Sequence, residues 1–294
     1  MKIKCIDQKS ELFPTKLKEL QRCPKQIFVL GNEMILSEFS LAVIGSRKAS
    51  MFGKNIAKNI SMELATNNIT IISGFARGID TIAHEMCIEK GSKTIAVLGG
   101  GHNKIYPSEN KKMIDEILKN DGAIISEYPA DYPSLPNNFR ERNRIIAALS
   151  DGIVLVEAKK NSGSLITVNY GKSLNKKIFA VPGCLDNELY EGSNYVLSSG
   201  AYCIRDANDI YAKYPELKMF IKKEKNKEFE ISDDLKNVYK SLSYMPKSLD
   251  EICLKSKEPL NKVMSKITLL EMIGAVEKVE GQKFVKIKKK YMNI

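Results

Sequence analysis

The sequence of 294 residues has no tryptophan, only two histidines, and six dispersed cysteines that never form a C-x-x-C pair. This composition argues against a zinc site and against a disulfide framework, so we expect neither a metal nor a cofactor. Unpaired cysteines of this kind fit a reducing compartment.

Long apolar segments are also missing. No run approaches the roughly 18 apolar residues that a membrane span requires. The first residues, M-K-I-K-C-I-D-Q-K-S-E, lack the apolar stretch of a signal peptide. We therefore expect a cytoplasmic protein that does not bind a membrane.

Several motifs of nucleotide-using enzymes are absent. The chain contains no G-x-x-x-x-G-K-[ST] loop for ATP, no G-x-G-x-x-G turn for a dinucleotide and no G-x-S-x-G nucleophile elbow. Of the two histidines, His84 lies in a helical pattern and His102 in a glycine loop. The sequence thus indicates no catalytic residue, and we expect that the protein is not an enzyme.

Arginine is scarce but clustered. Of the 46 cationic residues only seven are arginine, and five of these fall in three blocks: G-S-R-K-A-S at 45–50, S-G-F-A-R-G-I-D at 73–80 and F-R-E-R-N-R at 139–144. A guanidinium grips phosphate through two parallel hydrogen bonds, which an ammonium cannot do. The blocks therefore predict one shared phosphate-bearing ligand, the alternative being scattered surface charges. The net charge of +11 favours a polyanionic partner.

Six short, continuous apolar runs alternate with helical patterns. Continuous runs indicate strands that are covered on both faces, and the interposed helices make βαβ units of a parallel sheet. We predict an open, mostly parallel Rossmann-like α/β sheet with helices on both faces. The predicted strands are 41–44, 69–72, 94–98, 123–126, 152–156 and 177–181, and the predicted helices are 53–66, 80–90, 108–120, 140–149 and 165–174.

The glycine- and serine-rich turns follow the strands directly. In open α/β sheets ligands bind at the carboxyl ends of the strands, where helix N-termini present unpaired N–H groups. We therefore expect the turns to converge on one edge of the sheet. Aromatic residues near this edge can stack on bases or belong to the core: Phe75, Tyr106, Tyr128 and Phe139.

The chain divides into four parts. Residues 1–40 predict a short helix and an extra strand packed on the sheet edge, and 41–212 hold the Rossmann-like domain. The charged residues 213–232 are typical of a linker. Residues 233–294 predict three helices and a hairpin, which describe a small winged-helix domain. Its third helix has lysines but no arginine or glutamine, so contact with duplex DNA, docking of a protein and a packing role all stay open.

The arginine blocks and their neighbours resemble a known family. I-G-S-R-K-A-S, I-I-S-G-F-A-R-G-I-D-T-I-A-H, I-A-V-L-G-G-G, F-R-E-R-N-R-I-I-A-A-L-S, S-G-S-L-I-T and F-A-V-P-G occur in the order expected for DNA-processing protein A, also called DprA or Smf. The match covers roughly residues 20–210, and a weaker one near 235–288 resembles that family's winged helix.

The resemblance implies a recombination mediator that binds single-stranded DNA, forms a homodimer and promotes loading of the RecA recombinase in natural transformation. Arg142 and Arg144 would contact phosphate, although one of them can instead pair with Glu127 or Glu157. The complete set of implied nucleic-acid-binding residues is Gly45, Ser46, Arg47, Ser73, Gly74, Phe75, Arg77, Gly78, Lys104, Arg142, Asn143, Arg144, Ser162, Gly163 and Ser164.

Two other functions stay open at this point. One is a nucleotide-processing enzyme similar to phosphoribohydrolases and lysine-decarboxylase-like proteins, which carry P-G-G-x-G-T-x-x-E at a helix start. Here Thr167 is followed by Val168, Asn169 and Tyr170, so the glutamate is absent. The other is a transcription regulator that reads duplex DNA through the winged helix and senses a nucleotide in the α/β domain.

Overall fold

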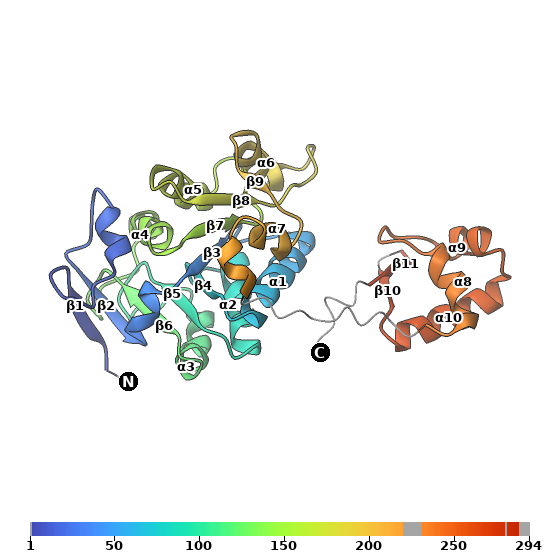
Figure 1. Ribbon diagram of the computed structural model, residues 1–294, viewed down its shortest axis with the longest axis horizontal. Helices are drawn as coiled ribbons and strands as arrows, with labels where there is room; N and C mark the ends of the chain where they lie inside the picture. Colours follow the sequence, from blue (N-terminus) through green and yellow to red (C-terminus); the bar gives the residue numbers. More distant parts are fainter. Residues whose placement is uncertain (1, 220–230, 280, 288–294) are drawn as a thin grey trace. The chain divides into compact units, whose positions relative to one another are not determined.

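The structure is a computed structural model that describes residues 2–219, 231–279 and 281–287. The chain forms two compact units, Met1–Ile221 and Lys222–Ile294. Figure 1 shows the elements of each unit.

The first unit is built on a nine-stranded sheet with the strand order β1-β2-β6-β5-β4-β3-β7-β8-β9. Strands β3 to β9 are parallel to one another, whereas β2 runs antiparallel to β6 and β1 antiparallel to β2. The strands are β1 Lys4–Asp7, β2 Gln26–Gly31, β3 Ser40–Ile44, β4 Thr70–Ser73, β5 Thr94–Val97, β6 Ala123–Ser126, β7 Gly152–Leu155, β8 Lys177–Ala180 and β9 Tyr202–Cys203.

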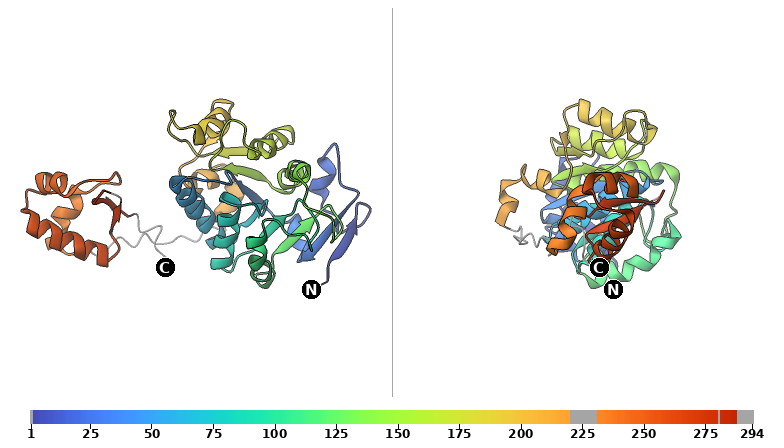
Figure 2. Two further views of the ribbon diagram at one scale, coloured as in Figure 1. Left: turned by 180° about the vertical axis from the view of Figure 1, so that it is seen from behind. Right: turned by 90° about the vertical axis from the view of Figure 1, so that its right-hand side faces the viewer.

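Helices cover both faces of this sheet, as Figures 1 and 2 show. Side chains of α1, α2 and α7 form the core on one face, and those of α4, α5 and α6 form the core on the other. The helices are α1 Met51–Thr66, α2 Ile79–Glu89, α3 Met113–Lys119, α4 Pro136–Leu149, α5 Ser164–Ser173, α6 Glu191–Ser198 and α7 Ala207–Tyr211, with short 3-10 helices η1 Thr15–Glu19, η2 Glu33–Ser37, η3 Ser108–Lys112, η4 Glu188–Tyr190 and η5 Pro215–Met219.

The predicted Rossmann-like sheet is confirmed. Every residue of the central strand β3 is buried, as its continuous apolar run indicates for a strand covered on both faces. One predicted helix, 108–120, is divided into η3 and α3. Another begins at Pro136 rather than at residue 140, because proline fits the first turn of a helix, where its missing N–H costs nothing.

The chain after α7 differs from the predicted linker. Tyr214 and Leu217 are almost fully buried in the core beneath α1 and α7. The Tyr214 hydroxyl donates a hydrogen bond to the carbonyl of Asp151 at 2.9 Å. Residues 213–217 therefore belong to the α/β unit, while residues 220–230 of the predicted linker lie outside the described residues.

The N-terminal residues extend the sheet. Strand β2 pairs with β6, and β1 adds a further strand that the sequence analysis missed. Phe13, Leu17 and Leu20, around η1, are buried in the main core. The predicted short helix and extra strand at this edge are thus present, the helix as η1.

The second unit contains helices α8 Asp233–Ser241, α9 Leu249–Ser256 and α10 Leu260–Met272, followed by the hairpin β10 Val276–Val279 and β11 Lys283–Lys286. Its own core joins all three helices to the hairpin through Val238, Ile252, Ile267 and Phe284, among others. A complete capping box at Ser248 and Glu251 fixes the start of α9.

Two features are absent from the described part of the chain. None of its helices has the length and apolar character needed to cross a bilayer. It also holds no group of three or more His, Cys, Asp and Glu side chains arranged to bind a metal ion.

The packing of η5 makes a testable prediction. Replacing Leu217 with alanine should lower the free energy of unfolding by about 2–5 kcal/mol, because the side chain leaves a cavity in the core. The neighbouring change Glu216→Ala, at an exposed position, should alter it by less than about 0.5 kcal/mol. Urea unfolding followed by circular dichroism measures both, and equal small effects would mean that this segment is a linker after all.

Candidate nucleic-acid interface

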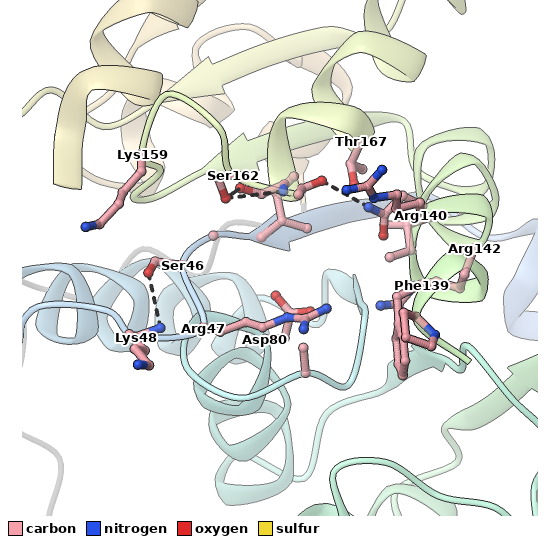
Figure 3. Close-up of a pocket in the computed structure, with 18 of the residues that line it drawn as sticks. Ser46, Arg47, Lys48, Asp80, Phe139, Arg140, Arg142, Lys159, Ser162 and Thr167 are labelled. Atoms are coloured by element: carbon pink, nitrogen blue, oxygen red, sulfur yellow. Dashed lines mark hydrogen bonds between the residues drawn. The ribbon is translucent and has the colours of Figure 1, made fainter. Parts of the chain in front are cut away.

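A cavity of about 830 Å³ opens at the carboxyl edge of the parallel strands. Figure 3 shows most of the residues that line it. They come from the end of β3 and the turn after it, the turn and helix after β4, the loop after β5, helix α4 with the loop before it, and the turn and helix after β7: Ile44, Gly45, Ser46, Arg47, Lys48, Ala76, Asp80, Tyr106, Ser134, Pro136, Phe139, Arg140, Arg142, Asn143, Ile146, Lys159, Asn161, Ser162, Gly163, Ser164 and Thr167.

The three arginine blocks meet at this edge, as the sequence predicted. The carbonyl of Ser46 accepts a hydrogen bond from the Ile79 N–H at 3.2 Å. Gly78, which has φ of +79°, lies so close that a Cβ there would be 2.2 Å from the same carbonyl. Only glycine fits such a position, so the turns after β3 and β4 are packed against each other.

Arg47 and Arg140 are exposed cations at the cavity. The guanidinium of Arg47 lies 5.5 Å from the centre of the Phe139 ring. Within the described residues, no carboxylate lies within 4.0 Å of the charged nitrogens of Arg47, Arg140 or Lys48. These side chains are therefore available to an anionic ligand.

Arg142, by contrast, is an internal residue and only 3% exposed. Its Nη1 donates to the carbonyls of Gly74, just after β4, and Val97, the last residue of β5. A Cβ on Gly74 would be 2.6 Å from Oδ2 of Asp80 and 2.7 Å from Arg142, so glycine is required between the two charges. The predicted phosphate contact by Arg142 is corrected accordingly, because its hydrogen bonds are used to hold the turns together.

Arg144 is also structural. It is buried, and its Nη2 donates to both carboxylate oxygens of Glu127 at 2.6 and 2.7 Å. The sequence left open an ion pair with Glu127 or Glu157, and the first is confirmed. The predicted phosphate contact by Arg144 was wrong, since helix α4 turns this side chain away from the cavity.

The end of β4 and the turn after it lie inside the protein and do not line the cavity. Phe75 is fully buried against the side chains of Leu98 and Met113, so it cannot stack on a base as predicted. The hydroxyl of Ser73 donates to the carbonyl of Val43 at 2.7 Å. Ser73, Gly74 and Phe75 therefore shape the site without reaching the cavity, which corrects their assignment as direct contacts.

Asn143 connects α4 to the start of α5. Its Nδ2 donates to the carbonyl of Gly163 at 3.0 Å. The hydroxyls of Ser162 and Ser164 lie 2.7 Å apart, and Gly163 between them is exposed. All four residues line the cavity, where the sequence predicted them.

Arg77 and Lys104 lie outside the cavity lining. Arg77 is exposed and forms an ion pair with Glu109, and its Nη1 donates to the Tyr106 hydroxyl at 3.2 Å. Tyr106 does line the cavity. To bind phosphate, Arg77 would have to leave Glu109, whereas Lys104 is exposed at the surface of the described chain.

Sequence reasoning missed several lining residues. Lys48 and Arg140 lie inside two of the arginine blocks, so membership of a block was the signal that could have identified them. Lys159 and Asn161 follow β7 directly, at the edge where ligands were expected. Ser134 comes from the proline-rich loop before α4, and no sequence pattern indicated which side chains of this loop would face the cavity.

The model of the DNA recombination-mediator protein A family matches residues 4–215, which is most of the α/β unit. The chain belongs to this family. The resemblance to DNA-processing protein A is thereby confirmed.

Known members show how far the similarity extends. Protein Smf of Escherichia coli is 32% identical over 286 residues, which cover 94% of this chain and 75% of the relative. DNA processing protein DprA of Streptococcus pneumoniae is 37% identical over 204 residues, 69% of this chain and 72% of the relative.

Two solved structures of DNA processing protein A share the fold. The X-ray structure from Streptococcus pneumoniae has a TM-score of 0.68 and 35% identity, and the match covers 72% of this chain and 75% of that one. The structure from Helicobacter pylori, which describes a single-stranded DNA binding mode, has a TM-score of 0.66 and 29% identity over 74% of this chain and 97% of that one.

In this member of the mediator family, Asp80 is a buried acid at the start of α2. It accepts a hydrogen bond from the Gly74 N–H at 3.1 Å. Burial raises the pKa of its carboxyl group to about 6, although the nearby charge of Arg142 opposes the shift. Burial likewise lowers the pKa of the Arg142 guanidinium to about 10.

The raised pKa of Asp80 predicts a pH dependence of stability. The folded protein keeps a proton that the unfolded chain releases between about pH 4 and 6, so the free energy of unfolding falls as pH rises through this window. A rise in pKa from about 4 to about 6 corresponds to about 3 kcal/mol. The stability of the wild type relative to Asp80→Asn should therefore drop by about this amount between about pH 3.5 and 7.5. Parallel curves for the two proteins, from urea unfolding across this range, would contradict it.

Proposed function

We propose that this protein binds single-stranded DNA along the cavity and acts as a recombination mediator without catalytic turnover. One observation carries the proposal: three exposed cations without a carboxylate partner in the described chain, Arg47, Lys48 and Arg140, line one cavity, and among the described lining residues only Asp80 is acidic. Membership of the mediator family and the single-stranded DNA binding mode described for the Helicobacter pylori protein support it.

The geometry suits a backbone of unpaired polynucleotide. Arg47 presents a guanidinium fork for phosphate, and the turn Ser162–Ser164 offers hydroxyls at the start of α5. Phe139 lies beside Arg47, and its ring centre is 5.5 Å from that of Tyr106. Bases that stack on such rings gain about 1–3 kcal/mol each regardless of sequence.

The proposal extends to partners. A protein that coats incoming single strands and hands them on would promote loading of the RecA recombinase, and we propose this partner and a homodimer on the strength of the family alone. On the same ground we place the protein in the cytoplasm, where it would meet such a partner.

The third helix of the second unit, α10, gives little support to binding of duplex DNA. On α10, Lys266 is held by Asp234 at 3.0 Å and by Glu258 at 2.8 Å. The exposed side chains of this helix are mixed: Met264 and Met272 are apolar, whereas Asn261 and Lys262 at its start are of the types that read bases. The fixed Lys266 and the exposed methionines favour protein docking, and Asn261 and Lys262 keep duplex DNA as the alternative ligand.

An enzymatic role has weaker support. Thr167, the threonine at the start of α5, is buried and is not followed by a glutamate. Incubation with AMP should therefore release neither adenine nor ribose 5-phosphate, as measured by liquid chromatography. Release of adenine that disappears in the Asp80→Asn variant would identify Asp80 as a catalytic acid and overturn the proposal of a protein without turnover.

The single-strand proposal is tested at Arg47. Arg47→Ala should weaken binding of oligo-dT by about tenfold or more, because one charge-assisted phosphate contact is lost. The plot of log affinity against log salt should become shallower by about 0.7, and mixed sequences should be affected equally. Arg205→Ala is the matched control, because this exposed arginine is bound to Asp209 and does not line the cavity. In fluorescence anisotropy, equal affinities for both variants, or a loss confined to some sequences, would count against the site.

A further inference from the structure

Two large apolar side chains are exposed at the start of α1, next to the cavity. Met51 is 71% and Phe52 is 52% exposed. They follow Lys48, which lines the cavity, by only three and four residues. Since a chain spans at most about 3.6 Å per residue, the backbone of Phe52 lies within roughly 14 Å of that of Lys48.

This end of α1 is rigidly held. Ser50 caps the helix by accepting a hydrogen bond from the Gly53 N–H at 3.0 Å, and it donates both its N–H and its hydroxyl to the buried carboxylate of Glu157. A Cβ on Gly53 would be 2.5 Å from Oε2 of Glu157, so the helix start fits closely over this acid. Such a support fixes the backbone that carries Phe52 before any ligand arrives.

A second aromatic residue braces the ring of Phe52. The ring of Tyr190 lies edge-on to it, with centres 6.0 Å apart, and the Tyr190 hydroxyl is 2.8 Å from that of Ser50. Tyr190 itself is buried. Phe52 is therefore fixed from one side while half of its surface stays open to a ligand.

Cations border the path from the cavity to this ring. Figure 3 shows Lys48 and Lys159 on opposite sides of one end of the cavity, the end next to α1. The Gly192 N–H donates to the carbonyl of Ala158 at 2.8 Å, so the segment that carries Tyr190 is tied to the turn that carries Lys159. Lys159 pairs with the exposed Glu188, a contact that phosphate can replace.

We propose that Met51 and Phe52 form a base-stacking platform that extends the single-strand site beyond Lys48 and Lys159. The proposal rests on the proposed function, because the platform would be reached by a strand that leaves the cavity. Its ligand is an unpaired nucleobase, held by ring stacking on Phe52 and apolar contact with Met51, with the flanking phosphates near the two lysines. The cations favour a nucleic acid over a protein partner at this place.

The affinity test uses substitutions at the exposed ring. Phe52→Ala should weaken binding of a long oligo-dT by about 5- to 150-fold, the factor that corresponds to one lost base stack. The loss should be smaller for an oligo-dT just long enough to fill the cavity, and Phe52→Leu, which keeps the apolar surface, should fall between. Thermal melting of each variant checks that the fold is retained.

A direct readout is available because the chain has no tryptophan. In the Phe52→Trp variant the introduced indole should stack on a base, and its fluorescence should be quenched when long oligo-dT is added. Met34→Trp is the matched control: Met34 is 62% exposed in η2, which follows the antiparallel strand β2 and so lies at the opposite edge of the sheet. The fluorescence of this control should not change.

The outcomes separate this inference from the function on which it rests. If wild-type protein binds oligo-dT but the fluorescence of Phe52→Trp is not quenched, and Phe52→Ala binds normally, the platform is refuted while the single-strand site stands. If wild-type protein ignores oligo-dT at low salt, both are refuted. Quenching in Phe52→Trp together with a length-dependent loss of affinity in Phe52→Ala would establish the platform.

Discussion

The buried guanidinium of Arg142 joins the ends of β4 and β5 through the carbonyls of Gly74 and Val97, with the Asp80 carboxylate on the other side of Gly74. Burying a charge costs several kcal/mol unless hydrogen bonds and an opposite charge compensate it, and here the Nη1 hydrogen bonds and the charge of Asp80 offset part of this cost. Because the turn after β4 is fixed in this way, Gly78 can press against Ser46 and the turn after β3 is fixed in its place. The shape of the cavity depends on this one group.

The positive charge of Arg142 also repels the positive charge of Arg47 at the cavity. The pKa of Arg142 is lowered mainly by burial but also by the charge of Arg47, while Asp80 opposes this effect. Arg47 and Arg142 thus repel each other across the site, and no carboxylate in the described chain pairs with Arg47. An anionic ligand beside Arg47 would relieve that repulsion, so the buried network both builds the cavity and favours a phosphate within it.

Periodicity and strand patterns were enough to predict the parallel sheet, because buried strands such as β3 are short continuous apolar runs that end at turn residues and alternate with helical patterns. Because these strands are parallel, the turns that follow them lie together at the carboxyl edge of the sheet. The edge strands β1 and β9 were not predicted, because β1 buries one of its four side chains and β9 buries none, so neither has a continuous apolar run. The segment around Tyr214 was predicted as a linker because its lysines and glutamate are typical of one. Two buried side chains among them, Tyr214 and Leu217, join the segment to the core.

The assignment of single arginines failed where the phase of α4 was unknown. Helical residues three, four and seven apart share a face, so a helix that begins at Pro136 turns Phe139, Arg140 and Asn143 toward the cavity. Arg144 is one residue beyond that face and meets Glu127 instead. The pattern over 140–149 gave the relative positions of these side chains, but it did not show which face of the helix would meet the cavity. The clustering of arginine marked Arg142 and Arg144, which are held inside the protein by two backbone carbonyls and by a carboxylate. A guanidinium that binds phosphate has the same sequence signal, and only the three-dimensional surroundings separate these uses.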